Sequence, residues 1–138
     1  MDKEQIKTIL PHREPMLLVD SATIDSEETS TGWYTVKGDE FFLQGHFPGN
    51  PVVPGVILCE ILAQSSCVLL ADKVKGGTPY FTSLNNVKFK KPVKPGDKIE
   101  LCCQLVKSRP PFYFVNGKGK VEGRLCFSGE FSFAVVEG

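Results

Sequence analysis

The longest apolar segment of the chain has the pattern of a helix that is buried on every side. From Val56 to Ala71 the sequence contains no Gly or Pro, and Pro54 suits the first turn of a helix that starts there. A helix without a polar face is normally buried all round, so we predict a central helix over this segment, stopped by Gly76-Gly77. Its apolar residues are Val56, Ile57, Leu58, Cys59, Ile61, Leu62, Ala63, Cys67, Val68, Leu69, Leu70 and Ala71.

Most other segments alternate apolar and polar residues with a period of two, which is typical of half-buried strands. The predicted strands cover residues 16–24, 33–37, 80–93, 99–105, 112–122 and 127–135. The polar residues 26–32 predict a hairpin turn, and residues 3–10 predict a short amphipathic helix that Pro11 ends. One helical turn capped by Asp39 is predicted before the glycine-rich loop. One buried helix and about six strands predict an antiparallel α+β domain that spans residues 1–138.

The predicted helix has no face to give to water, and one curved sheet can cover only part of it. We therefore expect a second copy of the chain to cover the remaining face. This expectation makes the protein at least a dimer.

The composition is that of an ordinary globular protein and argues against several functional classes. Sixteen basic and sixteen acidic side chains give a formal net charge of zero, which disfavours wholesale nucleic-acid binding. No apolar run reaches the ~20 residues of a membrane span, so we expect a cytoplasmic protein without membrane insertion. The five cysteines have no C-x-x-C spacing and neither of the two histidines lies near a cysteine, so we expect reduced thiols and no metal site.

Candidate chemistry is concentrated around the start of the predicted helix. His46, a natural base near neutral pH, lies in a loop whose Gly and Pro residues specify one unusual backbone path. Those residues are Gly45, Pro48, Gly49, Pro51, Pro54 and Gly55. Glu60 lies in the middle of the apolar helix, with Gln64 on the same face. Burial should raise the pKa of the Glu60 carboxyl group, so that it can act as an acid near neutral pH.

The first turn of the helix offers a third element of catalysis. Unpaired N–H groups and the positive end of the helix dipole near Gly55 and Val56 can hold a developing oxyanion. A base, an acid and an anion site within twenty residues indicate acid–base catalysis. Structural alternatives stay open for each residue taken alone. His46 can serve as a turn residue, and Glu60 as half of an ion pair, although no Lys or Arg lies within one helical turn of it.

Three ordered motifs carry a resemblance to a known family. Residues 45–64 read Gly-His-Phe-Pro-Gly-x-Pro-x-x-Pro-Gly-x-x-x-x-Glu-x-x-Ala-Gln, which resembles the signature of the FabZ-type 3-hydroxyacyl-[acyl-carrier-protein] dehydratases of bacterial fatty-acid synthesis. Residues 10–20, Leu-Pro-His-Arg-Glu-Pro-Met-Leu-Leu-Val-Asp, and residues 89–97, Phe-Lys-Lys-Pro-Val-Lys-Pro-Gly-Asp, also resemble segments of that family. The likeness therefore spans most of the chain.

The resemblance implies the hotdog fold, in which a sheet wraps a central helix and two protomers join, with a trimer of dimers as the usual higher assembly. It implies that water is eliminated from a (3R)-3-hydroxyacyl thioester on acyl carrier protein, giving the trans-2-enoyl thioester. His46 of one protomer would act as the base and Glu60 of the other as the acid. No metal or organic cofactor is expected, because the chemistry is proton transfer at an activated carbon.

The same resemblance suggests supporting roles around these two residues. Gly55 and Val56 would bind the enolate-like oxygen at the helix start, and Phe47 would belong to the substrate-binding set. Gln64 would orient Glu60 or the departing water.

Three other functions stay open. A hotdog thioesterase would direct water at the thioester carbonyl, and a bifunctional dehydratase would also isomerise its product. The isomerising family usually carries Asp where this chain has Glu60. A catalytically silent module that binds acyl carrier protein is the alternative outside enzymes.

Two more sets of residues have a structural and a functional interpretation. His12 and Arg13 are predicted to anchor the N-terminal segment by hydrogen bonds, with substrate or carrier contact as the alternative. A basic cluster is predicted to be a solvated strand face, with docking of an acidic carrier as the alternative. This cluster consists of Lys88, Lys90, Lys91 and Lys94.

Overall fold

The computed structural model describes residues 1–74 and 77–137 and contains one sheet and one long helix. Four helical segments are present: α1 (Lys3–Lys7), the 3-10 helix η1 (Phe41–Leu43), α2 (Gly55–Leu69) and α3 (Ala71–Val74). The strands are β1 (Ser21–Ile24), β2 (Thr29–Thr35), β3 (Gly77–Phe89), β4 (Lys98–Arg109), β5 (Phe112–Val121) and β6 (Arg124–Glu137).

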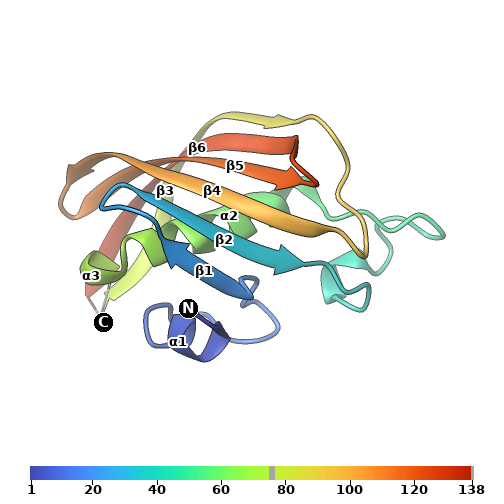
Figure 1. Cartoon of the computed structure of the whole chain (residues 1–138), viewed down its shortest axis with the longest axis horizontal. Coiled ribbons are helices and arrows are strands. Elements are labelled where there is room, and N and C mark those ends of the chain that lie inside the picture. The colour runs from blue at the N-terminus through green and yellow to red at the C-terminus, as the bar shows by residue number, and fades with distance from the viewer. Residues whose placement is uncertain (75–76, 138) are drawn as a thin grey trace.

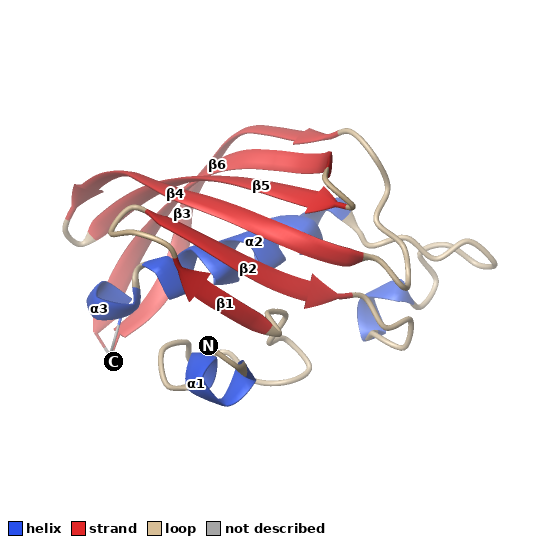
Figure 2. Ribbon diagram, in the orientation of Figure 1, coloured by secondary structure: helices blue, strands red, loops and turns tan. Residues whose placement is uncertain are grey.

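The six strands form a single antiparallel sheet with the order β1-β2-β4-β5-β6-β3. The sheet curves, and α2 runs along its inner side, behind the strands in Figure 1. The same layering is visible in Figure 2, where α2 is the one long blue ribbon beneath the red strands. The predicted antiparallel α+β architecture is confirmed.

Helix α2 lies so close to the sheet that two strand positions have room only for glycine. A Cβ atom on Gly32 of β2 would lie 2.1 Å from Ser65 Oγ, and one on Gly117 of β5 would lie 2.6 Å from Leu62 Cγ. All helix residues from Ile61 to Leu69 are buried. The approach of helix to sheet therefore depends on the missing side chains of these two glycines.

The start of α2 is the part of the helix that the sheet of the single chain leaves uncovered. Val56 is 77% exposed and Glu60 is partly exposed in the single chain. Helix α2 ends at Leu69 rather than Ala71. At the cap residue Leu70 the N–H also donates to Cys67 O, three residues back, and α3 follows directly. The predicted stop falls partly on residue 76, which lies outside the described residues, and Gly77 already belongs to β3.

Two predictions for the N-terminal half are wrong in their boundaries. The strand predicted over residues 16–24 begins only at Ser21. The preceding residues start in a turn, in which Met16 N–H and Leu17 N–H both donate to Arg13 O. The turn predicted over residues 26–32 ends at Glu28. Ser30, which is buried, and Gly32 lie in β2 and face the helix. The inward positions at the start of this strand therefore hold small residues instead of the apolar ones that a search for alternation detects.

Two shorter predictions also need correction. The helix predicted over residues 3–10 ends at Lys7, with Asp2 as its cap. Asp39 does not cap the turn at η1. The Glu40 carboxylate instead accepts from the N–H groups of Lys37 and Gly38 and from the Tyr34 hydroxyl. Partial burial alone would raise the pKa of Glu40, but these three hydrogen bonds outweigh it and lower the pKa.

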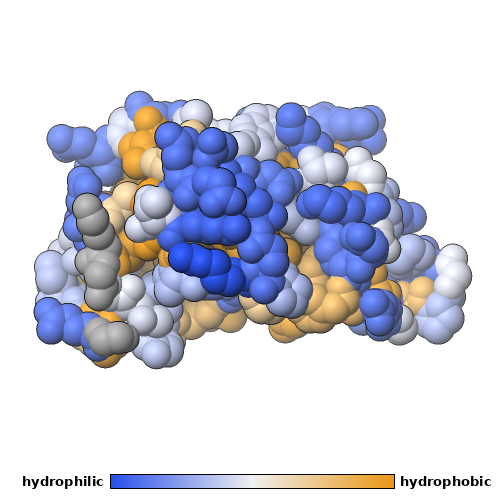
Figure 3. Space-filling view, turned by 90° about the horizontal axis from the view of Figure 1, so that it is seen from below, coloured by the Kyte–Doolittle hydropathy of each residue, from blue (hydrophilic) through white to orange (hydrophobic). Residues whose placement is uncertain are grey.

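Apolar side chains are exposed on the edge strand β3 and near the start of α2. Tyr80, Phe81, Leu84 and Phe89 of β3 are each at least 40% exposed. Figure 3 shows hydrophobic surface along the lower margin and at the left end of the molecule, around a hydrophilic centre. Exposed apolar surface next to an unpaired strand edge is typical of a protein interface.

We expect Gly117→Val to lower the free energy of unfolding by about 1–3 kcal/mol, because the new side chain would overlap Leu62. Denaturant unfolding at one fixed protein concentration measures the change. Lys118→Ala, at the exposed neighbouring position of β5, serves as the control and should change stability by less than about 0.5 kcal/mol. Equal stability of the two variants would contradict the close packing of α2 on β5.

Candidate active site

His46 is held in a compact loop between η1 and α2. Its backbone N–H donates to Leu43 O and its carbonyl accepts from Val52 N–H. Gly45 and Gly49 have φ values of 83° and 75°, which only glycine adopts at little cost. The glycines predicted to shape this loop are therefore required at these two positions.

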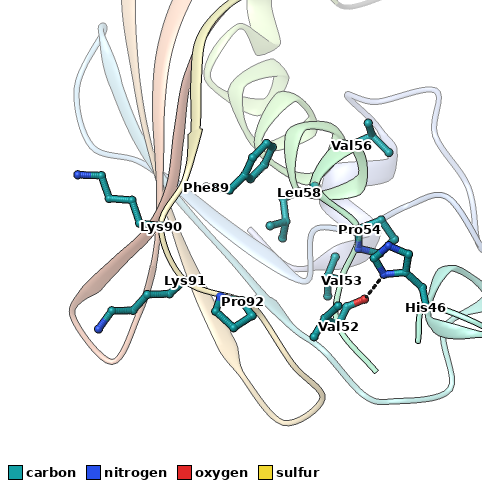
Figure 4. A pocket seen from close by; sticks show the side chains of 11 residues that line it. His46, Val52, Val53, Pro54, Val56, Leu58, Phe89, Lys90, Lys91 and Pro92 are labelled. Atoms are coloured by element: carbon teal, nitrogen blue, oxygen red, sulfur yellow. Dashed lines mark hydrogen bonds between the residues drawn. The ribbon is translucent and has the colours of Figure 1, made fainter. Parts of the chain in front are cut away.

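A side-chain hydrogen bond fixes which nitrogen of His46 can act as a base. His46 Nδ1 lies 3.0 Å from Val52 O, and Figure 4 shows this contact at the side of a pocket. A carbonyl oxygen only accepts, so Nδ1 carries the proton and donates. In the neutral ring, Nε2 is then left with its lone pair and is the basic nitrogen.

The pocket beside His46 has a volume of about 630 Å³ and a mainly apolar wall. Figure 4 shows the Phe89 and Leu58 side chains inside it and the ammonium ends of Lys90 and Lys91 directed away from His46. The lining residues are His46, Val52, Val53, Pro54, Gly55, Val56, Leu58, Phe89, Lys90, Lys91 and Pro92. An acyl chain with a polar head matches such a wall.

The start of α2 brings backbone donors to the same pocket. Ile57 N–H and Leu58 N–H donate to Pro54 O, whereas the N–H groups of Gly55 and Val56 have no acceptor within the described residues. A Cβ atom on Gly55 would lie 2.9–3.2 Å from three atoms of the Phe89 ring. Glycine at this position thus lets the Phe89 ring pack closely against the start of the helix.

Gln64 is the polar centre of the buried helix. The Gln64 side chain is 1% exposed. Its Oε1 accepts from Leu18 N–H at 2.7 Å, and its Nε2 donates to Met16 O at 2.6 Å. The same Nε2 lies 2.8 Å from Glu60 Oε2 and donates to it. Gln64 therefore fixes the Glu60 carboxyl group and the N-terminal segment together.

His12 is a residue near Glu60 that the sequence analysis did not place there. His12 Nε2 lies 3.4 Å from Glu60 Oε2. The predicted anchoring role belongs to Arg13, whose guanidinium donates to the carbonyl oxygens of Lys7, Leu10 and His12 itself. The motif Leu-Pro-His-Arg contributed to the family resemblance, but nothing in it predicts a contact between His12 and a residue 48 positions later in the chain.

Glu60 and His46 line different cavities of the single chain. The cavity at Glu60 is small, about 30 Å³, and Ala63 and Cys67 line it beside Glu60. Its remaining lining residues are His12, Gln64, Pro79, Phe81 and Phe133. The cavity at His46 and the cavity at Glu60 have no lining residue in common.

The described residues give little support to a cysteine nucleophile, a metal site or a membrane-spanning helix. Burial raises the pKa of the Cys59 thiol, and burial together with the nearby Glu60 carboxylate raises that of Cys67, so neither is a ready thiolate. Within residues 1–74 and 77–137, no three His, Cys, Asp or Glu side chains gather where they can hold a metal ion. No helix in these ranges has the length and apolarity to cross a membrane.

The chain is similar to curated dehydratases over nearly its full length. The family model of ApeI-like proteins, described as ApeI dehydratase, matches residues 22–130. The 3-hydroxyacyl-[acyl-carrier-protein] dehydratase FabZ of Clostridium beijerinckii is 40% identical over 95% of this chain and 96% of its own length. The FabZ of Bacillus velezensis is 41% identical over 99% of both chains.

Solved structures with low sequence identity share the fold. The dehydratase heterocomplex ApeI:P from Xenorhabdus doucetiae matches with a TM-score of 0.81 and 19% identity, covering 94% of this chain and 90% of that one. The HP0420-homologue from Helicobacter felis matches with a TM-score of 0.72 and 16% identity, covering 95% and 88%.

We expect Gln64→Leu to lower the free energy of unfolding by about 1–3 kcal/mol, because the buried N–H of Leu18 loses its acceptor. The measurement is denaturant unfolding beside Gln104→Leu, which makes the same change at an exposed position of β4. A loss no larger than that of the control would show that the Gln64 hydrogen bonds do not hold the N-terminal segment.

Proposed function

The chain belongs to the family of 3-hydroxyacyl-[acyl-carrier-protein] dehydratases of the FabZ type, and from this premise we propose how its residues carry the reaction. It is a hydro-lyase of fatty-acid biosynthesis that eliminates water from a (3R)-3-hydroxyacyl thioester to give the trans-2-enoyl thioester. The antiparallel sheet around α2 is the hotdog fold that the resemblance implied.

In the proposed mechanism, His46 is the general base. The observation that carries this role is the hydrogen bond from Nδ1 to Val52 O, which leaves Nε2 unprotonated beside the pocket. The thioester carbonyl acidifies the proton on C2, and Nε2 removes it. The electron pair of the broken C–H bond then becomes the second bond between C2 and C3.

The start of α2 stabilises the charge that develops on the thioester oxygen. The N–H groups of Gly55 and Val56 have no acceptor among the described residues and border the same pocket as His46. Donors that are fixed before the reaction, at the positive end of a helix, lower the energy of an enolate-like state. Phe47, next to the base and 54% exposed, is available to contact the substrate.

Glu60 supplies the proton that the leaving hydroxyl needs. In its protonated form it donates to the C3 oxygen as the C3–O bond breaks, so that the product is water. Gln64, bound to Glu60 Oε2, orients the carboxyl group during this step. The elimination leaves His46 protonated and Glu60 ionised, and proton exchange restores both before the next turnover.

The complete site requires two copies of the chain in this proposal. His46 and Glu60 border separate cavities of one chain, and apolar side chains of β3 and α2 lie exposed nearby. A partner that covers this surface would bring its own His46 to Glu60 and bury Val56. The proposed minimal assembly is a homodimer, and a trimer of dimers is the higher assembly that the family resemblance suggests.

We expect His46→Ala and Glu60→Gln each to lower kcat by about 10²–10⁴-fold, because each removes one proton-transfer group. The assay follows hydration of a crotonyl thioester by loss of its enoyl absorbance. Size-exclusion chromatography should show the assembly of the wild type for both variants. Near-full activity of either variant would refute its assigned role, and release of free thiol by the wild type would instead indicate a thioesterase.

The proposed substrate carrier is acyl carrier protein, and Lys90 and Lys91 at the pocket are its proposed contacts. Their ammonium groups point outward in Figure 4, where an acidic partner can reach them. Opposite charges of this kind mainly raise the association rate.

We expect Lys90→Glu/Lys91→Glu to lower kcat/KM for carrier-bound substrate several-fold at low salt, while activity on a small crotonyl thioester stays the same. Lys73→Glu/Lys118→Glu, which reverses two exposed lysines away from this pocket, is the control for the same change of net charge. Equal losses in the two variants, or a loss on both substrates, would contradict a docking role.

A further inference from the structure

We propose that His12 is a positioning residue for Glu60, which keeps the acid proton on the carboxyl oxygen that faces the substrate. The inference rests on the proposed role of Glu60 as the general acid. His12 Nε2 lies 3.4 Å from Glu60 Oε2, and both side chains are about three-quarters buried, with 22% and 24% exposed. In unliganded sites such contacts are often long and tighten when substrate binds.

The burial of His12 defines its tautomer. Nδ1 of His12 is buried and has no hydrogen-bond partner within the described residues. Nδ1 has no partner in either tautomer, so the neighbour of Nε2 decides between them: only a proton on Nε2 lets His12 donate to Glu60 Oε2, which lies 3.4 Å away. His12 therefore presents an N–H group to the carboxyl group of Glu60.

Two side chains then approach the same oxygen of Glu60. Gln64 Nε2 donates to Oε2 at 2.8 Å, and His12 Nε2 approaches that atom from the N-terminal segment. Oε1 has no partner among the described residues. When the contact with His12 tightens, Oε2 accepts from both side chains and becomes the poorer place for the acid proton, so the proton resides on Oε1 and is available for transfer.

Holding the N-terminal segment is not the task of His12 itself. Arg13 already fixes that segment through three carbonyl oxygens. Gln64 fixes it again through Met16 O and Leu18 N–H. The contact between His12 and Glu60 therefore adds orientation of the carboxyl group rather than attachment of the chain.

The test compares His12→Gln with His12→Asn in the crotonyl hydration assay. Both variants place an amide at this position, but only the longer Gln reaches the place of Nε2. We expect His12→Asn to lower kcat by about 10–100-fold, since misplacement of a reacting group by about 1 Å costs up to ~10²-fold. His12→Gln should recover most of that loss, and KM should change little in both.

Arg13→Leu provides the structural control, because it loosens the segment without removing the imidazole. If Arg13→Leu lowers Tm as much as His12→Asn and lowers kcat equally, His12 acts only through the placement of the segment and the inference is overturned. Equal kcat for His12→Gln and His12→Asn, whether high or low, overturns it as well.

Glu60→Gln in the same assay separates this inference from the proposed function. Retained activity of Glu60→Gln would mean that the acid role itself is wrong. An inactive Glu60→Gln beside a fully active His12→Asn would overturn the role of His12 alone and leave the mechanism in place.

Discussion

The close packing of α2 on the curved sheet is the constraint on which the rest of the structure depends. Gly32 and Gly117 leave room for the helix, and the helix then fixes both the free N–H groups at its start and the carboxyl group one turn later. Because the helix is buried against five of the strands of a sheet, these groups are held in place without any loop closing over them. Catalytic precision in this fold therefore comes from helix packing.

Gln64 extends that constraint to the polar side of the site. A buried amide that bonds two backbone groups of the N-terminal segment and the carboxyl group of Glu60 ties three parts of the chain into one network. Every polar atom of this side chain is satisfied, so the network costs little to bury and resists rearrangement. The same network brings His12 to Glu60 and so links the N-terminal motif to the chemistry.

Sequence periodicity predicted those parts of the fold whose burial is apolar and regular. The central helix and the inward side of β4, with Ile99, Leu101 and Cys103 buried, followed directly from the pattern. The start of β2 did not follow from the pattern. Ser30 and Gly32 face the helix there because the close approach of α2 leaves room only for small residues. The bond between Leu18 and Gln64 joins residues 46 positions apart and leaves no local signal. The predicted roles of His46 and Glu60 rest on residue type and position together with the motif resemblance, whereas their separate cavities are visible only in three dimensions.

The central claim is that each active site combines His46 of one protomer with Glu60 of its partner, and subunit mixing tests it most directly. His46→Ala and Glu60→Gln proteins, each inactive alone, are unfolded together and refolded as a mixture. Random pairing gives half mixed dimers, each with one intact site of two, so the account predicts recovery of about a quarter of the wild-type activity. No recovery, with mixed dimers present by mass spectrometry, would contradict the shared site and place both residues in one chain.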